Sequence, residues 1–162
     1  MGEDTKNLEG LGGWLICVGI GTVISPFRML IELGPMYKEI FNDADGTWEL
    51  LTTPGTEGYH PLWSPFLIGE IGIHAVLVIL SFYLIFLFFT KNKNFPKLFI
   101  GLAIFFLLFI LIDALIAKIV MPNLPFFVDQ DGLRDFGRAV TNCLIWIPYM
   151  LVSKRVKATF TR

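Results

Sequence analysis

Four long apolar stretches dominate this chain of 162 residues. They are Leu11–Leu33, Phe66–Thr90, Leu98–Met121 and Leu133–Ser153. Each has the length of about 20 mostly apolar residues that a helix needs to cross the hydrocarbon core of a bilayer. The fourth stretch is the most polar, since it contains Arg134, Asp135, Arg138, Asn142 and Pro148. The sequence therefore predicts an all-α membrane protein whose four transmembrane helices form an up-and-down bundle.

The composition agrees with a protein that folds in lipid. Hydrophobic residues make up 54% of the chain and charged residues only 17%, which is too little charge to cover a soluble surface. The length suits a single integral membrane domain over residues 1–162, with outer connections at 35–65 and 122–132. No cluster of Lys and Arg interleaved with exposed aromatic residues suggests a nucleic-acid partner. Glu3, Asp4 and Glu9 precede the first stretch, which argues against a cleavable signal peptide.

Lysine and arginine are distributed unevenly between the connections. Residues 1–10, 91–97 and 153–162 contain eight of them, namely Lys6, Lys91, Lys93, Lys97, Lys154, Arg155, Lys157 and Arg162. The connections 35–65 and 122–134 contain only Lys38 and Arg134. Connections rich in Lys and Arg stay in the cytoplasm, so we expect both termini and the connection 91–97 to be cytoplasmic.

The predicted helices carry their polar and ionisable side chains in the half nearer the outside. These residues are Arg28, Glu32, Glu70, His74, Asp113, Lys118, Arg138 and Asn142. A charged side chain in the middle of a bilayer costs about 2.5–3.5 kcal/mol on insertion scales. We therefore expect these side chains to face inward and to line a polar pocket that opens to the outside. Three pairs share a helix face at a spacing of four: Arg28 with Glu32, Glu70 with His74, and Arg138 with Asn142.

The connection between the second and third stretches is short, so these helices are expected to be antiparallel neighbours. If the chain is mirrored about Asn94, Glu70 is level with Lys118, and His74 is level with Asp113 to within one residue. We expect His74 to pair with Asp113, and Lys118 to bend outward to Glu70 or to a lipid phosphate. Two interpretations of this group remain open. It is either a proton relay or cation site, or an ion-pair cluster that sets the register of the helices.

The first stretch carries small residues at every fourth position: Gly13, Cys17, Gly21 and Ser25. Such a row lets another helix approach closely, so we expect this face to pack against protein. Pro26 follows the row and favours a kink or a water site. Cys17 and Cys143 lie within apolar stretches, which predicts free thiols and no disulfide.

The chain contains no convincing catalytic or metal-binding motif. Ser25, His74 and Asp113 lack the nucleophile elbow and oxyanion loop of a hydrolase. The "DADG" segment before Thr47 lacks the other ligands of a calcium loop and is better interpreted as a turn. His60 has no ligand partner at a recognisable zinc spacing. We therefore expect no enzyme activity, no cofactor and no bound metal.

Several motifs resemble one known family along nearly the whole chain. They are "GLGGWLICVGIG" with Pro26, "TWELLT", "YHPLWSPFLIGE" and the closing "IWIPYMLVSKRVKATF". The chain resembles a family of four-span bacterial inner-membrane proteins that is catalogued as domain of unknown function 2569. The resemblance implies a multi-pass protein of the bacterial inner membrane. It implies no reaction, cofactor or ligand.

Two classes of function fit these expectations. The first is a non-enzymatic accessory, assembly or sensing protein that uses the polar pocket and the outer connection for recognition. The alternative is a small proton-coupled transporter or channel-like protein, which would need to oligomerise because the inner half has no polar path. The expected partners are membrane lipid and another membrane protein or a second copy of the chain. The "SKRVK" segment is interpreted as a cytoplasmic anchor rather than a specific lipid site.

Overall fold

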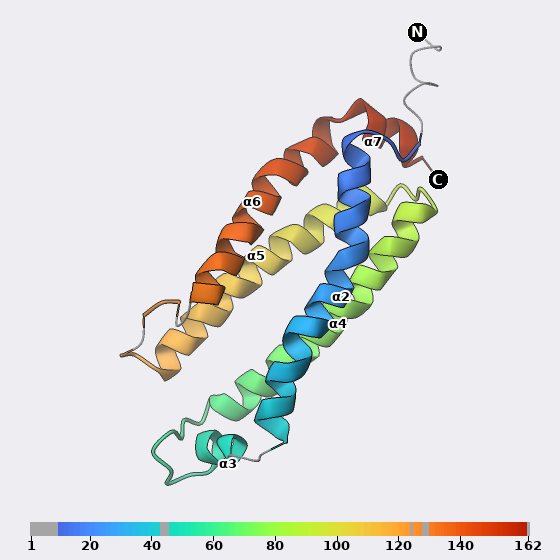
Figure 1. Ribbon diagram of the computed structural model, residues 1–162. Coiled ribbons are helices and arrows are strands. Elements are labelled where there is room, and N and C mark those ends of the chain that lie inside the picture. The colour runs from blue at the N-terminus through green and yellow to red at the C-terminus, as the bar shows by residue number, and fades with distance from the viewer. Residues whose placement is uncertain (1–9, 43–45, 124, 128–129, 162) are drawn as a thin grey trace. The chain divides into compact units, whose positions relative to one another are not determined.

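The computed structural model describes residues 10–42, 46–123, 125–127 and 130–161. Within these ranges the chain forms helices and no strands (Figure 1). The helices are α2 (Trp14–Phe41), α3 (Thr47–Thr52), α4 (Trp63–Phe89), α5 (Phe95–Val120), α6 (Gln130–Val152) and α7 (Lys154–Thr159). The all-α class predicted from the sequence is confirmed.

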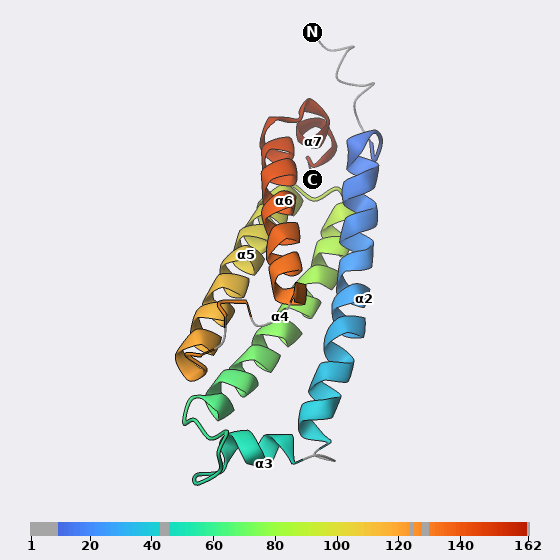
Figure 2. The same cartoon turned by 60° about the vertical axis from the view of Figure 1, so that its left-hand side comes forward.

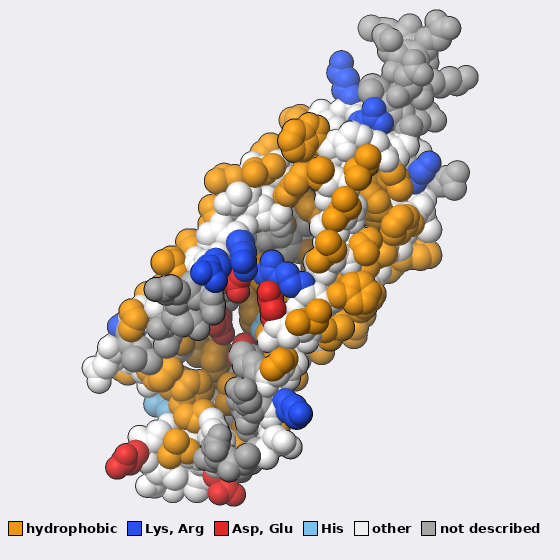
Figure 3. All heavy atoms as spheres, in the orientation of Figure 1, with side chains coloured by type: hydrophobic (Ala, Val, Ile, Leu, Met, Phe, Trp, Pro, Cys, Tyr) orange, Lys and Arg blue, Asp and Glu red, His pale blue; other side chains and the backbone are white. Residues whose placement is uncertain are grey.

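Three helices of the described part of the chain are long and apolar enough to cross a membrane. They are Trp14–Pro35 within α2, Trp63–Phe89 and Phe95–Val120, within a few residues of the first three predicted stretches. Ile31, Ile79 and Ile119 are more than half exposed on them, as expected where the solvent is lipid. Figure 3 shows hydrophobic side chains over much of one face of the molecule. The chain therefore has the helices of a multi-pass membrane protein.

The fourth predicted stretch forms a helix, α6, of 23 residues. It is not among the helices that qualify as spans by length and composition. The charged residues of its first turns lower its hydropathy, although a helix of this length extends over about 35 Å. A membrane span by α6 therefore stays a prediction.

The predicted outer connection 35–65 contains more helix than expected. α2 continues past Pro35 to Phe41, Thr47–Thr52 form α3, and α4 already begins at Trp63. Helices usually end before a proline, because the proline nitrogen donates no hydrogen bond. Here the segment after Pro35 keeps the helical path and brings Tyr37 to a partner on α4, described below. Pro26, also inside α2, is fully buried and does not end the helix.

The chain divides into two compact units. Unit 1 comprises Met1–Val23 and Tyr83–Arg162, and unit 2 comprises Ile24–Phe82. α2 and α4 each contribute one part to each unit. The single integral domain expected over residues 1–162 stays a prediction.

The core of unit 1 is apolar and rich in phenylalanine. Its buried members are Leu15, Val18, Leu84, Leu87, Phe88, Phe95, Met150, Val156 and Phe160. The ring of Phe95 is stacked on that of Phe160 at 4.6 Å and lies edge-on to that of Phe88 at 5.1 Å between centroids. Because these rings come from α4, α5 and the segment after α7, they join three helical segments at one end of the unit.

Within unit 1, the helix that runs beside α5 is α6 (Figures 1 and 2). The Cys143 thiol on α6 lies 3.4 Å from the carbonyl oxygen of Ala103 on α5, where it can donate a hydrogen bond. The structure thus pairs the third and fourth predicted stretches. Cys17 and Cys143 are free thiols, as predicted.

The two ends of the chain meet in unit 1. The backbone N–H of Gly10 donates to the hydroxyl oxygen of Thr159 at 3.1 Å, and that hydroxyl donates to the Gly10 carbonyl at 3.2 Å. The turn between α4 and α5 lies at the same end, since Phe95 packs on Phe160. Gly10, Phe95 and Thr159 therefore lie at one end of unit 1. The expectation that both termini and the connection 91–97 are cytoplasmic stays a prediction.

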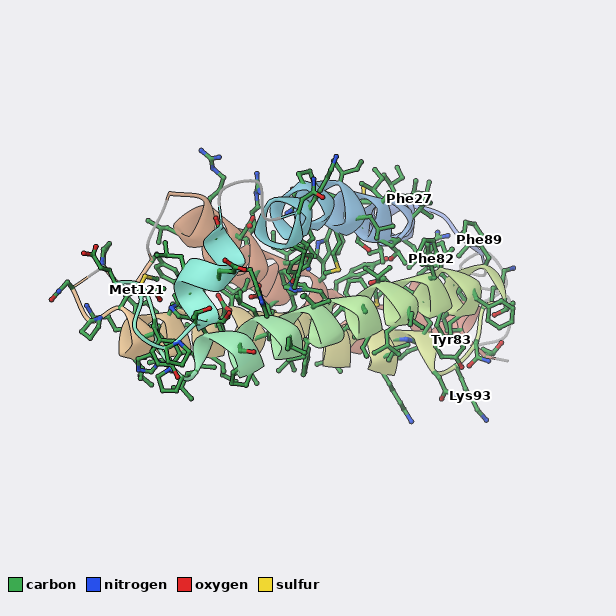
Figure 4. The ribbon with its side chains drawn as sticks, turned by 90° about the horizontal axis from the view of Figure 1, so that it is seen from below. Phe27, Phe82, Tyr83, Phe89, Lys93 and Met121 are labelled. Atoms are coloured by element: carbon green, nitrogen blue, oxygen red, sulfur yellow. The ribbon has the colours of Figure 1, made fainter. Side chains whose placement is uncertain are left out.

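In unit 2 aromatic rings join α2, α3 and α4. The rings of Phe27 on α2 and Phe82 on α4 meet edge-on, with centroids 5.6 Å apart, and Figure 4 shows them directed toward each other. The ring of Phe41 at the end of α2 lies 5.1 Å from that of Trp48 on α3. α3 is thereby held beside the far end of α2. These contacts fix the two helices that carry the polar site.

Candidate functional site

A largely buried group of polar side chains lies in unit 2, between α2 and α4. His74 on α4 is buried, and its Nδ1 atom is 2.7 Å from the hydroxyl oxygen of Tyr37 on α2. The two rings meet edge-on at 6.1 Å between centroids. A hydrogen bond of this length between two helices of one unit is strong enough to set their register.

Glu70 completes this group. Its Oε1 atom is 3.9 Å from Nδ1 of His74, one helical turn further along α4. The side chains of His74 and Glu70 are only 10% and 14% exposed, so both are largely withdrawn from the surroundings. The predicted neighbourhood of Glu70 and His74 is confirmed. We call Tyr37, Glu70 and His74 the polar triad.

The polar triad offers two partners to the same ring nitrogen. When His74 is neutral with its proton on Nε2, Nδ1 accepts the hydrogen bond that the Tyr37 hydroxyl donates. When His74 is protonated, Nδ1–H becomes a donor, and the charge is balanced by the carboxylate of Glu70. Protonation of His74, with a small movement of its imidazole, therefore changes whether the ring contacts Tyr37 or Glu70.

Tyr37 was missed by the sequence reasoning, which placed it in the outer connection. One signal could have found it. The buried face of α2 follows Leu15, Val18, Thr22 and Pro26 at helical spacing, and Met29 and Leu33 continue it. One more turn along the same face reaches Tyr37. The proline at position 35 hid this continuation, because a helix is expected to end there.

Three of the predicted pocket residues, Arg28, Glu32 and Arg138, lie on helix surfaces instead. Arg28 Nε contacts Glu32 Oε1 at 2.9 Å, and Arg138 Nη1 donates to Asp135 Oδ1 at 2.9 Å. All four side chains are about half exposed. The expectation that Arg28, Glu32 and Arg138 face inward is therefore wrong for this chain. A partner three or four residues away on the same helix neutralises each charge locally, so no burial is needed.

Asn142 is exposed, so the expected pair with Arg138 does not enclose it. Arg138 uses Asp135 instead, which lies three residues earlier on the same helix. Arg138 and Asn142 thus lie four residues apart on α6, as predicted, but both side chains are exposed and do not line a pocket.

Asp113 and Lys118, both on α5, belong to unit 1. One carboxylate oxygen of Asp113, Oδ1, is buried and has no hydrogen-bond partner among the described residues. The ammonium group of Lys118 donates to the carbonyl oxygen of Pro122 at 2.7 Å, beyond the end of α5. Lys118 therefore bends toward the end of its own helix. The expected pairs of His74 with Asp113 and of Glu70 with Lys118 join different units and stay predictions.

The small-residue row of α2 is not the face that packs in this chain. Gly13, Cys17, Gly21 and Ser25 are all exposed, and a Cβ atom on Gly21 would meet nothing within 4 Å. Close approach occurs instead at Gly19, where a Cβ atom would lie 2.7 Å from the ring of Phe88. The expectation of a packed row is therefore wrong within the chain. Packing of this row against another protein stays a prediction.

The remaining sequence-based candidates for a metal site are His60 and the "DADG" segment. His60 Nδ1 accepts a hydrogen bond from the backbone N–H of Leu62 at 3.3 Å. In the part of the chain that the structure describes, no three His, Cys, Asp or Glu residues gather as metal ligands would. Of the "DADG" segment only Gly46 is described, with a left-handed φ of 66°. The acidic residues of that segment lie outside the described ranges.

Comparison with known families gives one match. A family model described as "Protein of unknown function (DUF2569)" matches residues 8–161. No curated protein and no solved structure matches the chain. The family is the one that the sequence motifs resemble.

Proposed function

Because the chain belongs to the family of proteins of unknown function DUF2569 and has the helices of a multi-pass membrane protein, we propose that it is a non-enzymatic sensing or accessory protein of the bacterial inner membrane. Its sensing site is the polar triad. Four helices cross the bilayer, both termini are cytoplasmic, and the polar triad is reached from the periplasm. Membrane lipid and a second copy or another membrane protein are its partners.

The observation that carries this proposal is the contact of Tyr37 with Nδ1 of His74 at 2.7 Å, beside Glu70 at 3.9 Å. An ionisable side chain inside a membrane span is costly and is usually retained for a function. Histidine is the side chain whose charge changes near neutral pH. A buried histidine with one neutral and one acidic partner on two helices converts protonation into a change of contact between those helices. That is the minimum a pH or ligand sensor requires.

The unequal distribution of Lys and Arg supports the orientation. Single cysteines at Thr56 and at Asn92, in a background without Cys17 and Cys143, test it in intact cells. An impermeant thiol reagent is expected to label Thr56→Cys and to leave Asn92→Cys unlabelled until the cells are opened. The reverse pattern would overturn the orientation and with it the periplasmic access to the polar triad.

The sensing role is tested on the protein in lipid nanodiscs. The chain has two histidines, so His60→Gln leaves His74 as a single 15N-labelled imidazole for NMR. We expect a neutral ring with its proton on Nε2 that changes partner on acidification. Tyr37→Phe is expected to shift the Nδ1 resonance and the midpoint of the titration. The matched control, Tyr83→Phe, alters an exposed tyrosine of the same helix as His74 and is expected to change neither. A His74 signal indifferent to Tyr37→Phe would refute the site.

A second candidate, a proton-coupled carrier, is supported by a different observation. Oδ1 of Asp113 is buried on a helix that qualifies as a span and has no hydrogen-bond partner among the described residues. A carboxyl group in that position is suited to take up and release a proton. Protein reconstituted in liposomes with an internal pH dye would then dissipate a pH gradient, and Asp113→Asn would abolish this. Absence of any flux with the unaltered protein would leave sensing as the sole proposal.

A further inference from the structure

Positive charge is concentrated at the end of unit 1 that contains α7. The residues are Lys91, Lys93, Lys97, Lys154, Arg155 and Lys157, which we call the basic collar. Lys and Arg side chains are seen near α7 in Figure 3, and Lys93 extends away from the helices in Figure 4. Residues 10–23, 83–112 and 136–161 contain no Asp or Glu. The described part of this end therefore has charge of one sign and no internal counter-charge.

Arg155 has a defined position within the basic collar. Its guanidinium group lies against the backbone of Gly12 and Gly13, and a Cβ atom on Gly12 would come within 2.8 Å of Nη1. The arginine is half-buried, yet no described residue supplies it with an ion pair or a hydrogen bond. The two glycines thus make room for a guanidinium group whose five donors remain to be satisfied. The group is partly exposed, so its donors can be reached by an acceptor from outside this part of the chain.

The level of the basic collar in the membrane follows from its neighbours. The apolar spans begin or end here, at Trp14, Phe89 and Phe95. The ring of Trp146 lies 6.4 Å from that of Trp14 and 5.9 Å from that of Tyr149. Amphipathic rings of this kind are enriched at the level of lipid headgroups. The basic collar therefore lies where the phosphate groups of the bilayer lie.

Two of the three cations of α7, Lys154 and Lys157, are exposed, whereas Arg155 lies against Gly12 and Gly13. Val156, Thr159 and Phe160 are buried in unit 1, whereas Lys154 and Lys157 are exposed. The side chain of Ser153 caps the helix by accepting from the N–H of Val156 at 3.4 Å. The short helix is thus held by its cap and by its apolar face. Its lysines are directed away from the protein, toward whatever surrounds this end.

We propose that the basic collar binds the phosphate group of an anionic phospholipid, with Arg155 as the central ligand. The guanidinium fork matches two oxygens of a phosphodiester, and the positive end of the α2 dipole lies beside it. Lys154 and Lys157 add non-directional attraction to the same headgroup. A role in topology alone requires only the number and side of the cations. It does not require an arginine packed on two glycines.

This proposal is independent of the polar triad, which belongs to the other unit. It predicts a preference for anionic over zwitterionic lipid. Each Lys or Arg near an anionic surface strengthens attraction by about fivefold. Arg155→Gln is therefore expected to lower the preference about fivefold or more, since it removes a directional contact as well. Lys154→Gln with Lys157→Gln is expected to lower it by about 25-fold.

The preference is measured by quenching of tryptophan fluorescence by brominated lipids. Full-length protein carrying Trp48→Phe and Trp63→Phe keeps only Trp14 and Trp146, which lie beside the collar. It is placed in bilayers of brominated phosphatidylglycerol mixed with phosphatidylcholine. The relative binding constant of the two lipids is the readout. Lys118→Gln removes a cation that contacts Pro122 instead, and serves as the matched control. Arg155→Lys is expected to restore part of the preference.

Several results would overturn the proposal. One is an unchanged lipid preference in both the Arg155→Gln and the Lys154→Gln/Lys157→Gln proteins. Another is an equal loss of preference in the Lys118→Gln control. Suppression of the preference by millimolar inorganic phosphate would show that the ligand is a soluble anion. Glu3, Asp4 and Glu9 all lie outside the described residues, and Glu9 is the nearest of them in sequence to Gly12. If Glu9→Gln and Arg155→Gln lower thermal stability equally and neither alters lipid preference, Arg155 serves an internal ion pair instead.

Discussion

Replacement of Gly19 by alanine tests how α2 packs in unit 1. Gly19 is buried, and a Cβ atom there would lie 2.7 Å and 2.8 Å from two carbons of the Phe88 ring. That ring is held by Phe95 and Phe160, whose centroids lie 5.1 Å and 5.9 Å away. Phe88 therefore has little freedom to move aside, and the added methyl group must displace helix or ring.

The expected magnitude follows from two opposing terms. Overpacking a buried site by one methyl group costs about 1–3 kcal/mol. Alanine in place of glycine gains about 1 kcal/mol of helix propensity. Gly19→Ala is therefore expected to lower the free energy of unfolding by about 0–2 kcal/mol. Gly21→Ala, two residues away on the same helix, meets nothing within 4 Å and keeps only the gain. The difference between the two variants isolates the clash, at about 1–3 kcal/mol.

The assay is reversible unfolding in mixed micelles of mild detergent and dodecyl sulfate, followed by circular dichroism. Gly19→Ala is expected to unfold at a lower mole fraction of dodecyl sulfate than Gly21→Ala. Equal midpoints, or a more stable Gly19→Ala protein, would refute the close approach of Phe88. The same preparations report on the small-residue row. If Gly21→Leu leaves unfolding unchanged but alters the oligomeric state, that row is an interface between copies.

Three further changes have defined outcomes in the same unfolding assay. Tyr37→Phe removes the hydroxyl that contacts Nδ1 of buried His74 and is expected to lower the free energy of unfolding by about 1–3 kcal/mol. Tyr83→Phe is expected to change it by less than about 0.5 kcal/mol. Equal effects of the two changes would contradict the hydrogen bond. Phe95→Ala removes a fully buried ring and is expected to cost about 3–5 kcal/mol, and a loss below 1 kcal/mol would show that this ring is not in the core. Lys91 has a left-handed φ of 55° after α4, which glycine adopts without strain, so Lys91→Gly is expected to raise the free energy of unfolding by about 1 kcal/mol. A less stable variant would contradict this.

The turn at Lys91 shows how far local sequence rules reach. The N–H groups of Lys91 and Asn92 close the end of α4 on the carbonyls of Phe88 and Leu87, at 3.1 Å and 3.0 Å. Asn94 then leads into α5, with Pro96 in its first turn. A short connection at this place was predicted from "KNKNFPK". It depends on a few adjacent residues, so it is accessible to reasoning from sequence.

The candidate site was only partly accessible in this way. Glu70 and His74 were recognised as neighbours, because a spacing of four on a helix is a local property. Tyr37 was not recognised as their partner, since Pro35 suggested the end of the first helix. The inward orientation expected for Arg28 and Glu32 was wrong, because these two residues neutralise each other on the helix surface. Whether a charged side chain pairs with a neighbour on its own helix or with a residue on another helix depends on interaction energies, and residue spacing in the sequence does not give these.

The sequence by itself determined that the chain is helical and where three apolar spans begin and end to within a few residues. These properties follow from the length and composition of contiguous stretches, which act on each helix separately. Only the tertiary structure decided which face of each helix is buried. Within unit 1 it placed Gly19 rather than Gly21 in close contact and α6 beside α5, and within unit 2 it placed Tyr37 beside His74. Rotation about a helix axis is set by the side chains of neighbouring helices, and an apolar helix in lipid carries little amphipathic pattern to specify it in advance.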